Sequence, residues 1–244
     1  CNGSGDCRKT QLSGGTMCPS FMATRNEKDT TRARANVLRE FLTRSDKANR
    51  FDHKEIKEVY DLCLACKGCK GECPSNVDVA KLKMEFLQQY YDTNGVPMRS
   101  WLVGNFSKMT GIASYVPWAY NLIFKNEPLR RMANQVVGFH PDRTMPLLHD
   151  TTLKSWFKKH ARSAEAVSPK QQNRVYLFCD EFTNYNDVEI GEKAIQLLEK
   201  LGYEVIIPDH APSARPQLSK GLLKDAKKIA EQNVRLLKDL ITDQ

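Results

Sequence analysis

Apolar residues recur at helical spacing through the first third of the chain. Between residues 30 and 43 they fall on one side of a predicted helix, and a second helix is predicted to begin at the capping box Asp52–Glu55. Asn76 is predicted to cap a third helix, whose apolar positions share one face until Gly95 ends the pattern. This part of the chain is therefore predicted to be all-α.

The pattern stays helical over residues 97–140 and then changes. Two prolines, Pro117 and Pro128, are predicted to break this stretch into separate helices. We expect three of its aromatic side chains to fill a core: Trp101, Trp118 and Tyr120. The polar sequence that follows predicts a connecting segment with one short helix around Trp156.

The last third of the chain has the period of a βαβ unit. Two short apolar runs, 175–179 and 204–208, flank an amphipathic helix that Gly202 ends. The crossover rule makes the two strands parallel. A last helix is predicted over 220–241. Because two strands alone do not make a stable sheet, we expect this α/β piece to be truncated or to lean on the helical domain.

The sequence thus predicts a mainly α protein in three parts. These are an all-α ferredoxin-type domain over 1–140, a connecting segment over 141–172 and a partial α/β domain over 173–244.

Four cysteines interrupt the helical pattern in the string CLACKGCKGECP. Cys63, Cys66, Cys69 and Cys73 have the spacing C-x2-C-x2-C-x3-C-P. A disulfide scaffold would be shorter and denser in cysteine than a chain with 8 Cys in 244 residues. Structural zinc usually takes its ligands as two separated pairs. The spacing is instead that of a two-cluster ferredoxin, in which the Pro-linked fourth cysteine ligates the other cluster. Zinc or an uncoordinated thiol cluster is the alternative.

A second cysteine stretch, CNGSGDCRKTQLSGGTMCPSF, opens the chain and repeats the CPS that follows the first run. Cys1 and Cys7 take the first and third places of the ferredoxin spacing, and Ser4 stands at the second. Cys18 is the Pro-linked fourth, displaced by a Gly-rich insertion. Crossed ligation then assigns one complete cluster to Cys18, Cys63, Cys66 and Cys69. It leaves three ligands for the second site: Cys1, Cys7 and Cys73.

The second site is one thiolate short, which leaves three outcomes open. It could hold a [3Fe-4S] cluster, a [4Fe-4S] cluster with Ser4, water or another residue at the open iron, or no cluster. The plain alternative is that Cys1 and Cys7 are loop thiols. Glycines around these cysteines suit a loop whose backbone N–H groups approach inorganic sulfide closely.

Composition limits the compartment and the function classes. The most apolar stretch, 112–124, is far shorter than the roughly 20 residues of a membrane-spanning helix. No basic and apolar leader precedes Cys1, and a chain that begins on a predicted ligand is expected to be a fragment of a longer polypeptide. Clustered reduced thiols suit the cytoplasm. A peripheral contact with a membrane stays open.

The net charge of +8, from 37 basic and 29 acidic residues, raises nucleic acid as a partner. The basic residues are spread among acidic ones, as in TRNEKDTTRARANVLREF, and no basic groove with interleaved aromatic residues is visible. We therefore expect no nucleic-acid partner, and a basic surface that is solvated or docks an acidic redox partner or flavin domain. A zinc-containing, basic nucleic-acid-binding or scaffold protein is the second hypothesis.

The cysteine stretches also resemble a known family. The strings CNGSGDCRKT…GTMCPSFMATRNEKDTTRARANVLR and LCLACKGCKGECPSNVDVAKLK are similar to the iron–sulfur portion of flavin-linked oxidoreductases. That group includes D-lactate and D-2-hydroxyglutarate dehydrogenases and relatives of the glycolate oxidase iron–sulfur subunit. The resemblance implies an FAD-binding domain and a substrate domain before this segment, and a D-2-hydroxy acid oxidised by FAD. Electrons would leave through [4Fe-4S] centres to an acceptor that the sequence does not name.

The last third resembles the start of the CCG-type domain of that family, with one departure. Pro212-Ser213-Ala214-Arg215 stands where a Cys-Cys-Gly triplet is expected. Cys179 is left alone, and we expect it to be a core residue rather than a ligand. No nucleotide-binding glycine motif or nucleophile–base pair is present, and the five His are expected at the surface or at caps: residues 53, 140, 149, 160 and 210. The segment alone is therefore not expected to turn over substrate.

Overall fold

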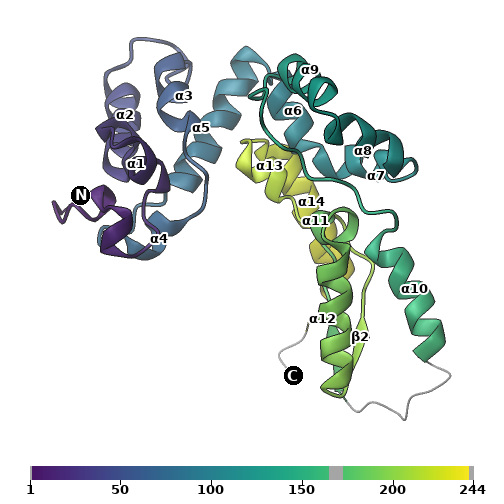
Figure 1. The fold of residues 1–244 in the computed structure, drawn as a ribbon. Coiled ribbons are helices and arrows are strands. Elements are labelled where there is room, and N and C mark those ends of the chain that lie inside the picture. Colours follow the sequence, from purple (N-terminus) through teal and green to yellow (C-terminus); the bar gives the residue numbers. More distant parts are fainter. Residues whose placement is uncertain (1, 165–172, 242–244) are drawn as a thin grey trace. The chain divides into compact units, whose positions relative to one another are not determined.

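The computed structural model describes residues 2–164 and 173–241 (Figure 1). The chain forms two compact units, one made of Cys1–Ser100 with Arg215–Ala226 and the other of Trp101–Ala214 with Lys227–Gln244. The fold is mainly helical, and the described residues add one parallel sheet of two strands, which confirms the predicted class. Domain boundaries at 140 and 172 stay a sequence-based prediction.

Three longer helices frame the first unit. They are α2 (Thr31–Arg44), α3 (Lys54–Asp61) and α5 (Val79–Asn94), and each lies where the apolar periodicity predicts a helix. Figure 1 shows α2 and α3 beside each other. Short elements surround the cysteine stretches: η1 (Asp6–Arg8), η2 (Gln11–Ser13), α1 (Pro19–Thr24), η3 (Glu27–Asp29), α4 (Gly68–Glu72) and, from the C-terminal part, α13 (Arg215–Ser219).

The helix starts differ from those predicted. His53, not Asp52, precedes α3, and the Asp52 carboxylate instead accepts a hydrogen bond of 2.7 Å from the Asn94 amide. Asp78, not Asn76, caps α5 through the backbone N–H of Lys81. Both departures have one cause. A side chain can cap a helix only at the residue where the helical backbone begins, and the tertiary contacts of the preceding loop set that residue.

The core of the first unit reaches the cysteines. Ile56, Tyr60 and Phe86, from α3 and α5, are fully buried and pack in one cluster with the partly buried side chain of Phe41. Three buried cysteines, Cys7, Cys18 and Cys69, belong to the same cluster, and the partly buried Cys63 and Cys73 pack against it. Burying each large apolar side chain contributes about 1.5–3 kcal/mol. The cysteine loops are therefore held against a packed helical core.

A run of helices makes up most of the second unit. After α6 (Met98–Gly104), whose first residues belong to the first unit, come α7 (Phe106–Ala113), α8 (Pro117–Lys125), α9 (Glu127–Val137), α10 (Leu153–Ala164), α11 (Glu181–Tyr185) and α12 (Val188–Lys200). Pro117 begins α8 and Pro128 lies in the first turn of α9, so the predicted breaks are confirmed.

The expected aromatic core of this run is wrong for two of its three members. Trp101 is 50% exposed and Trp118 is 68% exposed. Tyr120 is partly buried, and its hydroxyl donates a hydrogen bond of 3.2 Å to the carbonyl of Pro146. A helical period tells which residues share a face, but it does not tell what covers that face.

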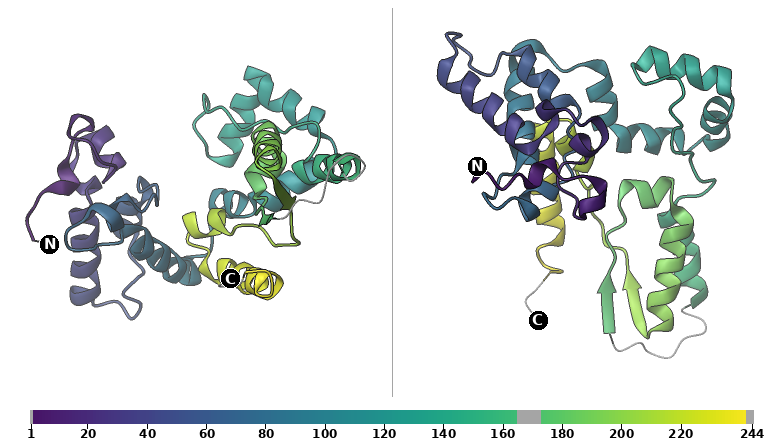
Figure 2. Two further views of the ribbon diagram at one scale, coloured as in Figure 1. Left: turned by 90° about the horizontal axis from the view of Figure 1, so that it is seen from below. Right: turned by 60° about the vertical axis from the view of Figure 1, so that its left-hand side comes forward.

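The sheet of the second unit is the predicted parallel pair. β1 (Asn173–Tyr176) and β2 (Tyr203–Ile206) lie side by side with Val175 opposite Val205 (Figure 2). Helix α12 connects them and packs on β2. The first strand was expected over 175–179, but β1 ends at Tyr176. Cys179 therefore lies after the strand and not at its last position.

The helix predicted over 220–241 is α14 (Leu223–Leu237), which is shorter at both ends. The short helix α13, which was not predicted, precedes it, and Gly221 lies between the two at φ 73°. A backbone in this left-handed region favours glycine and ends a helix.

Candidate iron–sulfur sites

Four of the predicted ligands line one pocket of the first unit. They are Cys18, Cys63, Cys66 and Cys69. Cys18 precedes α1, Cys69 lies on α4, and the other two lie in the loop that joins α3 to α4. Cys18 and Cys69 are buried, Cys63 is half-buried and Cys66 is exposed. The structure therefore places Cys18, from the N-terminal cysteine stretch, at one pocket with three cysteines of the other stretch. That these four bind one cluster stays a prediction.

The backbone around this pocket has a left-handed conformation at three positions that are not glycine. Cys18 has φ 61°, Ala65 has φ 54° and Lys67 has φ 61°. Each such residue costs about 1 kcal/mol or more, and such strain persists where the surroundings enforce it, often at functional sites. Loops with alternating helical hand present backbone N–H groups to one concave side, where anions bind.

Polar groups reach the sulfur atoms of this pocket. The Val79 N–H at the start of α5 donates to Cys69 Sγ over 3.4 Å. The Thr31 hydroxyl and the Arg34 guanidinium lie 3.6 Å and 3.7 Å from Cys18 Sγ. Burial raises the pKa of the Cys69 thiol, and the N–H groups that face it act in the opposite direction. Bound thiolates would find hydrogen-bond donors already in place.

Lys83 of α5 adds a positive charge beside the pocket. The side chain is buried, and its ammonium group donates a hydrogen bond of 2.6 Å to the carbonyl of Cys63. Burial lowers the pKa of Lys83 to about 8. A buried cation is costly without a counter-charge. An anionic group in the neighbouring pocket would supply one.

The remaining predicted ligands that the structure describes line a second pocket. Ser4, Cys7 and Cys73 lie in its wall. Cys1 lies outside the described residues. The Ser4 hydroxyl accepts a hydrogen bond of 3.5 Å from the Asp6 N–H, and Cys7 is buried. Two of the three thiols predicted for the second site therefore share a pocket with Ser4, and their role as ligands stays a prediction.

Glu72 joins the two cysteine stretches. Its carboxylate accepts hydrogen bonds from the N–H and hydroxyl of Thr16, both 2.6 Å, and from the N–H of Met17 at 3.0 Å. These bonds lower the pKa of the Glu72 carboxyl. The segment that ends at Cys18 is thereby tied to α4, which carries Cys69.

The thiols border cavities and do not converge on a point. Among the described residues, no three His, Cys, Asp or Glu side chains are close enough together to hold a single metal ion. A cubane instead binds its cysteines at the corners of a cage of several atoms, so it needs separated thiols around a space. Thiol donors, facing N–H groups and neighbouring cations fit such a group.

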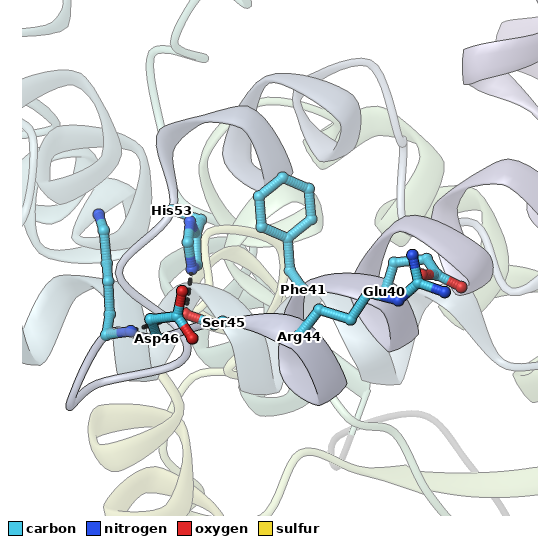
Figure 3. A pocket seen from close by; sticks show the side chains of 7 residues that line it. Glu40, Phe41, Arg44, Ser45, Asp46 and His53 are labelled. Carbon is cyan, nitrogen blue, oxygen red and sulfur yellow. Dashed lines mark hydrogen bonds and ion pairs between the residues drawn. The ribbon is translucent and has the colours of Figure 1, made fainter.

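Another pocket of this unit, shown in Figure 3, holds none of the predicted ligands. It lies at the end of α2, where the His53 ring meets the edge of Phe41 and its Nε2 lies 2.7 Å from the Ser45 hydroxyl. His53 stands at the N-cap position of α3, one of the places expected for a histidine, but its side chain makes no cap hydrogen bond.

Cys179 is buried in the second unit, as the sequence predicts for a core residue. Its Sγ lies 3.7 Å from the Asn184 side-chain oxygen, and its N–H donates to His210 Nε2. Burial raises the pKa of the Cys179 thiol to about 11. Ala214, in the place of the expected triplet, has φ 61°.

Sequence reasoning missed three residues that shape the sites: Arg34, Lys83 and Glu72. Lys83 lies on the buried face of α5 among apolar residues, and Arg34 lies on the buried face of α2 between Thr31 and Leu38. A charged residue at a core position was the available signal. No local pattern reveals Glu72, because its partners lie more than 50 residues away in the chain.

Comparisons with known proteins agree with this picture. Residues 1–78 match the family model of the 4Fe-4S dicluster domain. The D-2-hydroxyglutarate dehydrogenase of Escherichia coli (strain K12) is 30% identical over 98% of this chain, and that of Pantoea ananatis is 26% identical over 97%. This chain spans 27% of the length of each. No solved structure matches the chain.

One component of a different dehydrogenase is also similar. It is the C subunit of the anaerobic glycerol-3-phosphate dehydrogenase of Escherichia coli (strain K12), which is 23% identical over 69% of this chain, and the match covers 41% of that protein. The resemblance seen in the cysteine stretches is therefore confirmed. Residues 1–78 are a 4Fe-4S dicluster domain, in a chain that is distantly homologous over nearly its whole length to the D-2-hydroxyglutarate dehydrogenases.

Proposed function

We propose that this chain is the iron–sulfur electron-transfer portion of a flavin-dependent D-2-hydroxy-acid dehydrogenase. The flavin would be bound by another part of the same polypeptide or by a partner. The observation that carries the proposal is the division of the cysteines between two pockets, each lined by residues of both cysteine stretches. The names of the relatives support a D-2-hydroxy acid as the substrate of the whole protein.

The residues that would hold the clusters follow from the two pockets. Cys18, Cys63, Cys66 and Cys69 would hold a complete [4Fe-4S] cluster. The second would be held by Cys1, Cys7 and Cys73, with Ser4 at the open corner. A bound cluster supplies one-electron transfer, with a potential set by charge, burial and hydrogen bonds to sulfur.

The protein's own groups prepare the first pocket for added negative charge. Hydrogen-bond donors face two of its sulfur atoms, and the cations of Arg34 and Lys83 lie beside it. Burial of Cys18 and Cys69 keeps water away from that side. Exposed Cys66 lies on the open side, which is the shorter route for an electron to or from a partner.

The surface gives less support to a nucleic-acid-binding protein. Arg32 pairs with Glu27, and Arg44 pairs with Glu40, so basic residues of α2 are engaged with acidic neighbours. No helix among the described residues is long and apolar enough to cross a membrane. Reduced, clustered thiols favour a reducing compartment such as the cytoplasm.

The test is the metal content of protein purified without oxygen. We expect iron and acid-labile sulfide, broad visible absorbance and no stoichiometric zinc. Cys66→Ala removes a predicted ligand, so the protein should lose the iron of the first site. Because this thiol is exposed, its removal leaves no cavity and the fold should be kept. Cys179→Ala is the control and should keep it. Stoichiometric zinc would refute the proposal, as would iron that depends on Cys179.

A further inference from the structure

Arg34 is an arginine buried in the wall of the first pocket. Its side chain is 1% exposed and projects from the first turns of α2. The Nε atom donates to the carbonyl of Val59 over 3.0 Å. Nη1 lies 2.6 Å from the carbonyl of Asp29, 2.9 Å from the Ser20 hydroxyl and 3.7 Å from Cys18 Sγ. The guanidinium is thereby fixed against the sulfur of a predicted ligand.

Two hydrogens on Nη1 face three acceptors, so the acceptors compete. With a protonated Cys18, the thiol itself donates to the carbonyl of Asp29 over 3.0 Å. A thiolate at Cys18 has no proton to donate and is a stronger acceptor. The sulfur can then accept a hydrogen bond from Nη1 of Arg34, and the Ser20 hydroxyl can rotate towards another partner. A thiolate at Cys18 therefore has a charged hydrogen-bond donor already in place.

The carboxylate of Asp29 pairs with the charge of Arg34. Its Nη2 lies 3.4 Å from Asp29 Oδ1, and both side chains are buried. Asp29 also accepts a hydrogen bond of 2.7 Å from the Thr24 hydroxyl, which keeps the carboxylate in place. The guanidinium is therefore shared between a fixed carboxylate and the Cys18 sulfur, and its effect on the sulfur is weakened by Asp29.

We propose that Arg34 is a positioning residue that stabilises the reduced form of the complete site, with Asp29 limiting its effect. The inference rests on the proposed function. One electron taken up adds one negative charge to the site, which a buried cation at hydrogen-bond distance from a ligand favours. No proton is taken up with the electron at Arg34, because arginine is already fully protonated. The electron comes from the reduced flavin, or from the electrode in the test.

Two substitutions should move the midpoint potential of the complete site in opposite directions. Arg34→Gln removes the cation, and the ratio of reduced to oxidised cluster at a fixed potential should fall about tenfold, which is about 59 mV for a one-electron couple. Asp29→Asn removes the carboxylate and keeps the cation, so that ratio should rise. Disturbed packing alone would not give opposite signs. Arg39→Gln, an exposed change on the same helix, should leave the potential unchanged.

The experiment is an anaerobic redox titration followed by electron paramagnetic resonance, with iron and sulfide measured in each variant. The three-iron signal of mildly oxidised protein marks the second site and separates it from the first. If Arg34→Gln does not fold, the potentials of Arg34→Lys and Asp29→Asn are measured instead. Asp29→Asn must then raise the midpoint potential of the complete site. Unmoved potentials at full iron content would overturn the role of Arg34 alone. A chain without iron and sulfide would overturn the proposed function as well.

Discussion

Gly68, the first residue of α4, lies against the segment that leads to Cys18. A Cβ added there would lie 2.8 Å from the Thr16 hydroxyl and 3.1 Å from the Thr16 carbonyl oxygen. Gly71 on the same helix has open space at the corresponding position. Gly68→Ala and Gly71→Ala change helix propensity alike, but only Gly68→Ala disturbs the contact with Thr16. Comparing the two variants therefore isolates the effect of that contact.

The expected magnitudes follow from these distances. Alanine gains up to about 1 kcal/mol over glycine inside a helix, so Gly71→Ala should be neutral or stabilising. Gly68→Ala gains the same term but must push Thr16 away, and overpacking of this kind costs about 1–3 kcal/mol. Thr16 carries two of the hydrogen bonds to Glu72, so its displacement should move Cys18 from the pocket and reduce iron at the first site.

The assay compares iron and sulfide per chain and the thermal unfolding of the two variants, prepared without oxygen. We expect Gly71→Ala to match the unchanged protein and Gly68→Ala to lose iron from the complete site. If both variants retain the same iron and unfold at the same temperature, the segment before Cys18 does not pack on α4. The crossed arrangement of the pockets would then lose its structural basis.

The remaining predictions concern three other residues. Ser4→Cys should supply the missing thiolate, so that the protein keeps about eight rather than about seven iron atoms per chain after mild oxidation and loses the three-iron signal. The exposed control Ser13→Cys should change neither the iron content nor the signal. Equal iron in all three proteins would contradict the alignment of the first motif. Glu72→Gln should lower the melting temperature near neutral pH, because a carboxyl whose pKa is lowered on folding stabilises the protein above its ordinary pKa of 4.5 and loses that effect as the pH falls through the folded value. The two proteins should therefore converge in acid, and exposed Glu85→Gln should show no such dependence. Cys179, with a pKa of about 11, is only about 0.1% thiolate at pH 8, so it should be alkylated at least about 100-fold more slowly in the folded than in the urea-unfolded chain, as followed by mass spectrometry. Equal rates would show that this thiol is not buried.

The features that the sequence predicted correctly depend on neighbours in the chain. The existence and approximate place of α2 and α5 follow from apolar residues at helical spacing, and the breaks before α8 and α9 follow from proline. The parallel pairing of β1 and β2 follows from the handedness of a crossover through α12. The cysteine spacing, together with the Pro-linked echo, was sufficient to indicate a two-cluster site, because such a cluster takes three ligands at short fixed separations from one loop and a fourth from the other stretch.

Other features depend on residues that meet only after folding. The exposure of Trp101 and Trp118 could not be read from helical period, since the period does not state what covers a face. The burial of Arg34 beside Cys18, and the bonds from Glu72 to the segment before it, join elements that are distant or unrelated in sequence pattern. The sequence by itself thus determined which residue types could bind a cluster. Only the tertiary structure decided which charges and hydrogen-bond donors face those sulfur atoms, because electrostatic effects depend on distance and burial rather than on order along the chain.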